Sequence, residues 1–224
     1  LQLNTTGHDL VAVGEQAMAA NTTGQDSVAV GRNAMGSNTT GDFNTAVGAY
    51  ALDANTTAHN NTALGYNTLS TNTTGQYNTA VGGNALEANT TASNNVAVGK
   101  NALLVNTTGA ENTAVGAFSL DANIDGHSNT AFGRSSLSAN TSGDYNTALG
   151  MYALLNATTA DNNTAVGYAA LVSSTTGYSN VAIGKDASYG LTTGYYNTVI
   201  GHQAMNNGTT YVRCAALGFQ TLYN

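Results

Sequence analysis

The sequence predicts an all-β fold, a parallel β-solenoid (β-roll) built from short coils of equal length. Glycine recurs every 17 residues after a pair of small or apolar residues, at thirteen positions from Gly14 to Gly218. The chain contains no proline, which fits strands that use every backbone N–H. A fixed short period over a whole chain is typical of solenoids. We therefore predict one array of thirteen coils over residues 1–224, beginning and ending within a coil, with degenerate coils at 185–224.

The coils share a consensus, numbered here from position 1 to position 17, where position 17 is the periodic glycine. It reads x-N-A-L-x-A-N-T-T-G-x-x-N-T-A-V-G. The glycine at position 17 and the usual glycine at position 10 predict two corners, because glycine tolerates positive φ. Positions 3–8 and 13–16 are predicted to be extended, since they are rich in Thr, Val and Asn.

Alternation along a strand assigns these positions to two faces. Position 16 is apolar in every coil, and position 4 is Leu or Met except at Ser188. We predict that positions 4, 8, 14 and 16 face the core. Position 15 is Ala except at Val199, and position 3 is always small, so both columns are predicted to face outward.

A column kept small and apolar on an outer face indicates close approach by another molecule. The simplest candidate is an identical chain around a three-fold axis. We therefore predict a homotrimer whose seam is lined by position 15, with the candidate residues Ala46, Ala80, Ala114, Ala148 and Ala165.

Asparagine recurs at positions 7 and 13, where stacked amides can hydrogen-bond from coil to coil. The position 7 residues also match the Asn-x-Thr/Ser pattern of N-glycosylation. The candidate glycosylation sites are Asn4, Asn21, Asn38, Asn55, Asn72, Asn89, Asn106 and Asn140. We favour structural ladders over glycosylation, because a buried amide is not accessible to a transferase.

The run NTAVGxxAL, as in Asn44–Leu52 and Asn78–Leu86, resembles the NSxAxGxxAxA repeats in the heads of trimeric autotransporter adhesins. It is also similar to the Asn/Thr-rich repeats of phage tail fibres. The resemblance covers essentially the whole chain. It implies a left-handed parallel β-roll, wound as a homotrimer and displayed on a cell or virion surface, with an adhesive or spacer role.

Composition disfavours several classes of function. Charged residues make up 8% of the chain, and five Lys and Arg against a net charge of −7 leave no basic patch for nucleic acid. No apolar run approaches 18 residues, so no membrane span is predicted. The single cysteine, Cys214, excludes a disulfide framework and is predicted to be a small buried hydrophobe.

No catalytic, metal or cofactor site is predicted. The carboxylates lie at variable positions and form no recurring pair of the kind that acid–base catalysis requires. His8, His59 and His127 share position 11, but several coils separate them, so they cannot bind one metal ion. We therefore do not expect an enzyme.

Aromatic residues gather at the predicted corners. The candidates for surface aromatics at position 12 are Phe43, Tyr77, Tyr145 and Tyr196, which either stack on sugars or partners or cover neighbouring corners. Four of the five basic residues, Arg32, Lys100, Arg134 and Lys185, occupy position 1. They are predicted to be an exposed edge that opposes aggregation.

These observations predict a structural or adhesive fibre segment, a tail fibre or an adhesin, that is extracellular, at a cell surface or on a virion. Its expected partners are copies of itself and an unidentified cell-surface or glycan receptor. The alternative is a self-assembling extracellular filament, with or without glycosylation. An ice-binding solenoid is less favoured, because it needs two outward threonine columns and only position 9 is predicted to face out.

Overall fold

The computed structural model describes residues 1–222 and divides the chain into two compact units, Leu1–Glu111 and Asn112–Asn224. In the described residues the regular elements are short parallel β-strands, and no helix occurs. Each coil contributes one strand, and turns and bends make up the rest. The prediction of an all-β parallel solenoid with 17-residue coils is confirmed.

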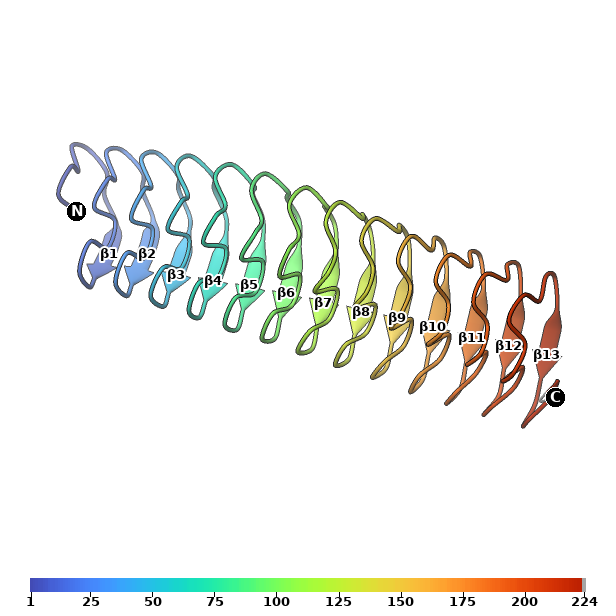
Figure 1. Ribbon diagram of the computed structural model, residues 1–224. Coiled ribbons are helices and arrows are strands. Elements are labelled where there is room, and N and C mark those ends of the chain that lie inside the picture. The colour runs from blue at the N-terminus through green and yellow to red at the C-terminus, as the bar shows by residue number, and fades with distance from the viewer. Residues whose placement is uncertain (223–224) are drawn as a thin grey trace. The chain divides into compact units, whose positions relative to one another are not determined.

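In the first unit the strands stack in chain order (Figure 1). Each strand residue pairs with the equivalent residue of the next coil, as Ala29 does with Ala46 and Ala46 with Ala63. The register therefore equals the sequence period. The strands are β1 (Leu10–Val13), β2 (Ser27–Val30), β3 (Thr45–Val47), β4 (Thr62–Leu64), β5 (Thr79–Val81) and β6 (Val96–Val98).

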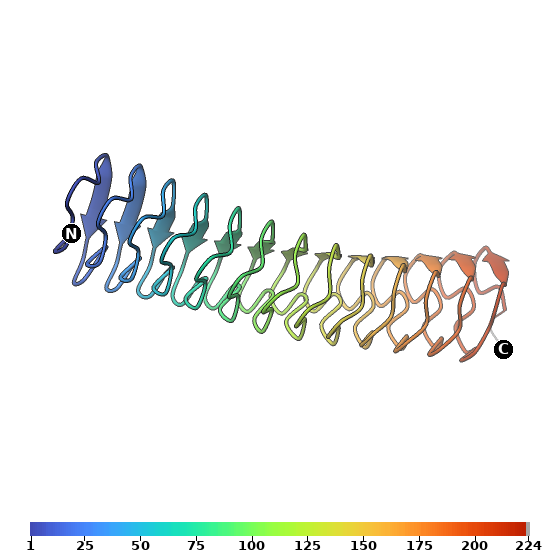
Figure 2. The same cartoon turned by 90° about the horizontal axis from the view of Figure 1, so that it is seen from above.

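The second unit repeats this arrangement with the same register, as in the pairing of Ala114 with Ala131. In either unit the strands lie along one side of the coils and the turns along the other (Figure 2). Its strands are β7 (Thr113–Val115), β8 (Thr130–Phe132), β9 (Thr147–Leu149), β10 (Thr164–Val166), β11 (Val181–Ile183), β12 (Thr198–Ile200) and β13 (Ala215–Leu217).

The second predicted extended run, positions 3–8, is wrong for its first half. Positions 1–6 form successive turns, in which Ala34 N–H donates to Gly31 O at 3.3 Å and Gly36 N–H donates to Asn33 O at 3.2 Å. Asn33 and Met35 have φ values of 56° and 51°, in the left-handed region. Bonds between coils support this conformation, since Met35 N–H also donates to Ala51 O at 2.9 Å.

The corner glycines differ from each other. At position 17 the prediction of positive φ is confirmed, with values such as 138° at Gly48 and 137° at Gly116. At position 10 it is wrong, because the positive-φ glycines of the described chain are all at position 17. Position 12 supplies the left-handed residue of that corner instead, as at Phe43 with a φ of 58°.

The interior of each coil is filled by positions 3, 4, 7, 13 and 15. Taking one coil of the first unit, Ala51, Leu52, Asn55, Asn61 and Ala63 are all 0% exposed. One large side chain at position 4 is thus surrounded by alanines and by asparagine amides. A close-packed interior of this width admits only small residues beside that one large side chain.

The predicted faces are therefore correct for position 4 and wrong for the other assigned positions. Positions 3 and 15 lie inside, whereas positions 14 and 16 lie on the surface, half-buried or exposed. A shift of one residue along a strand exchanges its two faces. The alanine columns are small because they pack inside their own coil.

Candidate interaction surfaces

The predicted trimer seam does not lie on the surface. All five candidate residues are 0% exposed within a single chain, namely Ala46, Ala80, Ala114, Ala148 and Ala165. A side chain buried in its own coil cannot contact a second chain. The prediction that these alanines form the seam is wrong, and the wrong strand phase is the reason.

The surface that the strands present consists of positions 14 and 16, and we call it the strand face. Position 14 carries Thr, Val or Ala, and position 16 carries Val, Leu, Ile or Phe. Several position 16 side chains are strongly exposed, among them Val47 at 39%, Phe132 at 52% and Leu149 at 46%. In each unit the strand face is thus an uncharged surface with a continuous apolar column.

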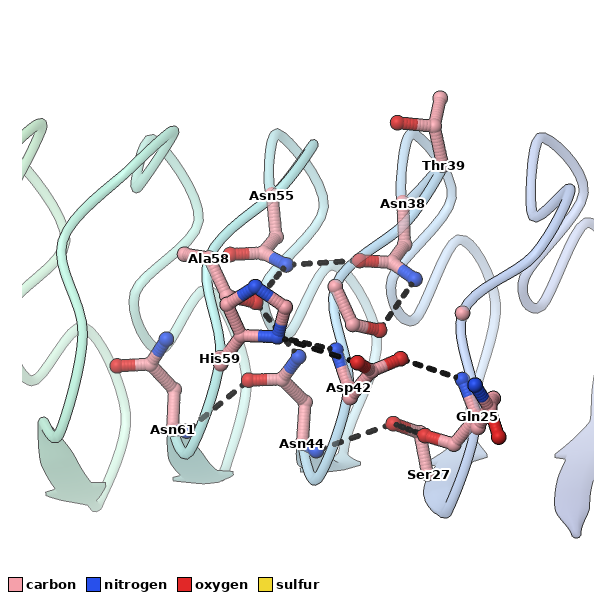
Figure 3. A network of polar contacts seen from close by, with 12 residues as sticks. Gln25, Ser27, Asn38, Thr39, Asp42, Asn44, Asn55, Ala58, His59 and Asn61 are labelled. Carbon is pink, nitrogen blue, oxygen red and sulfur yellow. Dashed lines mark hydrogen bonds and ion pairs between the residues drawn. The ribbon is translucent and has the colours of Figure 1, made fainter. Parts of the chain in front are cut away.

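Both predicted asparagine ladders are present. At position 7, Asn55 Nδ2 donates to Asn38 Oδ1 of the previous coil at 2.9 Å and to Ala58 O at 3.1 Å (Figure 3). At position 13, Asn44 Oδ1 accepts from Asn61 N–H at 2.9 Å, while Asn44 Nδ2 donates to Ala58 O at 2.8 Å. The ladders therefore satisfy amides that would otherwise be costly to bury.

The same contacts bear on the candidate glycosylation sites. Seven of them, namely Asn21, Asn38, Asn55, Asn72, Asn89, Asn106 and Asn140, are 0% exposed. Asn4 is exposed, and its Nδ2 donates to Gly7 O at 2.9 Å. Glycosylation of the folded chain at the seven buried positions is therefore contradicted, because the reacting amide nitrogen is inside the coil.

Position 11 forms a third row of contacts that the sequence did not indicate. Asp42 Oδ1 accepts from Gln25 N–H at 2.8 Å, and His59 Nδ1 accepts from Asp42 N–H at 2.9 Å (Figure 3). In the second unit Asp161 Oδ1 accepts from Asp144 N–H at 2.8 Å. These side chains link successive coils, although their variable identity suggested a solvated surface.

Threonine at position 8 was predicted to face the core, and this is wrong. Thr39 is half-buried at the end of the coil remote from the strands, and its hydroxyl donates to Thr56 O at 3.0 Å (Figure 3). Threonine at position 9, such as Thr40, is exposed. Positions 8 and 9 thus place two adjacent threonine columns at the surface.

The predicted surface aromatics are exposed, with exposed fractions of 57%, 59%, 62% and 51% for Phe43, Tyr77, Tyr145 and Tyr196. The structure adds cation–π contacts between position 1 and its aromatic neighbours, which the sequence analysis missed. The Arg32 guanidinium lies 4.8 Å from the centre of the Tyr50 ring. A cation followed 18 residues later by an aromatic residue was the available signal.

Another aromatic cluster lies in the second unit. The Tyr178 and Tyr195 rings stack with their centres 4.8 Å apart, and Tyr196 meets both rings edge-on. Partial burial raises the pKa of Tyr178, the Tyr196 and Tyr195 hydroxyls raise it further, and Arg213 acts in the opposite direction. These rings mainly cover one another.

Residues 1–222 contain no enclosed pocket and no group of three His, Cys, Asp or Glu residues that could hold a metal ion. Within the same residues no helix has the length and apolar character needed to cross a membrane. Cys214 is half-exposed, so the prediction that it is buried is wrong. Its backbone N–H accepts the ladder role of position 13 by donating to Asn197 Oδ1 at 3.0 Å.

Comparison with known proteins adds no relative. No protein-family model, no curated protein and no solved structure matches this chain.

Proposed function

We propose that the chain is a structural and adhesive segment of an extracellular or virion surface fibre, that it assembles with copies of itself as a homotrimer, and that it has no catalytic role. The observation that carries the proposal is the uncharged strand face with its apolar column at position 16. Exposed contiguous apolar surface of this kind typically marks an interaction site. The proposed seam is therefore the strand face, in place of the buried alanines.

Comparison between columns of the same coil supports this assignment. Position 12 is exposed and carries residues as different as Asp26, Phe43 and Arg213. Position 16 is also at the surface, yet all thirteen of its residues are apolar. Because both columns arose from the same repeats, the difference indicates a constraint on position 16 that solvent alone does not impose.

The size of the strand face sets what the assembly requires. With strands about 4.8 Å apart and about 3.3 Å per residue, a three-residue strand covers roughly 48 Å². Thirteen strands then cover roughly 620 Å², somewhat below the ~800 Å² per partner of a standard interface. Neighbouring positions must therefore contribute to the contact, and association should need many coils.

The native mass of the full chain tests the proposal. Multi-angle light scattering should give a mass near three times the 22.6 kDa of one chain. A trimer mass would support the fibre and would disfavour a solenoid that works alone. A mass of one chain over the whole accessible concentration range would overturn the proposal, because the strand face would then be stable in water without a partner.

Ice binding is a second candidate, favoured by the two threonine columns at positions 8 and 9. In the first unit position 9 is threonine in every coil, from Thr6 to Thr108. Regularly spaced hydroxyl and methyl groups suit a partner with a repeating lattice. Thermal hysteresis that disappears on Thr40→Lys and Thr57→Lys substitution would establish this function, and its absence in the intact chain would exclude it.

A further inference from the structure

Two clusters of cationic and aromatic side chains occupy the same coil positions in the two units. Each has an arginine at position 1, a tyrosine at position 2 of the next coil and a tyrosine at position 1 of the coil after that. The first unit contains Arg32, Tyr50 and Tyr66, and the second contains Arg134, Tyr152 and Tyr168. The repeated placement makes the clusters a structural motif of this chain.

The geometry of the two clusters agrees. The Arg32 guanidinium lies 4.8 Å from the Tyr50 ring centre, and the Tyr50 and Tyr66 rings meet edge-on with centres 6.2 Å apart. The Arg134 guanidinium lies 5.9 Å from the Tyr152 ring centre and donates to the Tyr152 hydroxyl at 3.2 Å.

The second cluster continues in the same way. The Tyr152 and Tyr168 ring centres are 6.0 Å apart, and Lys185 Nζ lies 5.9 Å from the centre of the Tyr168 ring. Lys185 Nζ also lies 3.7 Å from Asp186 Oδ2. Similar contacts in two separate parts of the chain indicate that the arrangement is reproducible.

Each cluster leaves one ring and one cation open to solvent. Tyr66 is 57% exposed and Tyr168 is 47% exposed. Arg32 and Arg134 are exposed as well, whereas Tyr50 and Tyr152 are half-buried between the cation and the outer ring. A ligand can therefore contact the outer tyrosine and the guanidinium at the same time, across a distance comparable to one or two sugar rings.

We propose that the two clusters bind anionic carbohydrate, meaning a saccharide that carries carboxylate or sulfate groups. The guanidinium offers donors in a fork that matches those groups, and an exposed tyrosine ring offers a flat apolar face for a sugar ring. Three of the five cationic side chains of a chain with net charge −7 lie at these clusters, so an anionic ligand finds favourable charge mainly there.

Packing of the coil corner accounts for only part of each cluster. A cation–π contact at an exposed site contributes about 0.5–1 kcal/mol, which explains the arginine and the half-buried tyrosine. It does not require the second, exposed ring at Tyr66 and Tyr168. The cluster of Tyr178, Tyr195 and Tyr196 lacks this open face, because its rings stack on one another.

The inference deepens the adhesive part of the proposed function and rests on it, so the test separates the two. Trigalacturonate is titrated into the full chain by calorimetry, with its neutral methyl ester as the matched ligand. The variants are Tyr66→Ala combined with Tyr168→Ala, and Arg32→Gln combined with Arg134→Gln. Tyr77→Ala with Tyr145→Ala is the control, since these tyrosines are equally exposed but lie outside the clusters.

We expect trigalacturonate to bind the intact chain and the control alike, at least tenfold more weakly to either cluster variant, and the methyl ester not to bind. Absence of binding to the intact chain, or unchanged binding in the cluster variants, would overturn the inference, and so would equal binding of the ester. Circular dichroism of every variant checks the fold. A trimer mass without binding would remove only this inference, whereas binding by a monomer would remove the fibre and leave the site.

Discussion

Ala114 and Val115 are neighbours in β7, and their opposite environments define the organisation of every coil. Ala114 is fully buried, while Val115 is half-buried on the strand face. The interior accepts a methyl group at position 15 because Leu or Met from position 4 and two asparagine amides occupy the remaining space. Larger residues appear only on the strand face.

Substitution of Ala114 by Glu tests this placement. A charge would enter a fully buried position with no partner, which costs several kcal/mol, about 4 or more. We expect loss of the cooperative melting transition or a fall of many degrees, measured by circular dichroism. A folded variant that merely dissociates into monomers would show that the alanine lies at a seam after all.

Asp53 gives a pH-dependent prediction. Burial raises the pKa of its carboxyl above the ordinary value, so folding favours the protonated form. The stabilising contribution is present below the pKa of the unfolded chain and is lost as pH rises through the folded pKa. Asp53→Asn should therefore melt like the wild type at low pH and at a slightly higher temperature at pH 7. An unchanged difference between these pH values would contradict this cause.

At the scale of the coil, the turn at position 17 is the least tolerant feature. Gly116 has a φ of 137°, and a Cβ added there would lie 2.5 Å from Gly133 O. Gly116→Val should therefore cost at least about 2 kcal/mol, measured by denaturant unfolding. Gly126→Ala is the matched control at position 10, where other coils carry Ala58, Ala92 or Ala160.

The control should lose clearly less stability than Gly116→Val, because Gly126 does not have a left-handed φ. Equal losses at the two corners would contradict the distinction between a glycine required by conformation and a glycine favoured by space. A change in the slope of the unfolding transition would instead point to an altered denatured or native state.

The sequence was sufficient for the period, the parallel register, the glycine at position 17 and the two asparagine ladders, because each of these depends on recurrence alone. The phase of the strand was not predictable in the same way. A three-residue strand such as Thr113–Val115 offers only two possible phases, and both place a regular column inside. Large apolar residues suggested the core, whereas the narrow coil selects alanine.

The turn at positions 1–6 escaped prediction for another reason. Leu52 and the other position 4 residues adopt left-handed φ values near 51°, which leucine rarely does. Bonds to the neighbouring coils, such as Leu52 N–H to Thr68 O at 3.0 Å, hold this conformation. Such stabilisation comes from the array, so no local sequence signal announces it.

For the whole molecule, the repeat makes every coil both a structural unit and a unit of surface. Each coil adds one rung to the amide ladders, one strand to its unit's sheet and one apolar residue to the strand face. Stability and self-association should therefore both grow with coil number, as expected for quasi-one-dimensional proteins.

The mass of a strand-face variant is the most direct test of the account. Val47→Glu combined with Leu149→Glu places one charge on the exposed strand face of each unit, and Thr74→Glu with Thr176→Glu places the same charges at the exposed position 9. Light scattering should give three times 22.6 kDa for the wild type and the position 9 variant, and one chain for a still-folded strand-face variant. A strand-face variant that keeps the trimer mass would contradict the proposed seam.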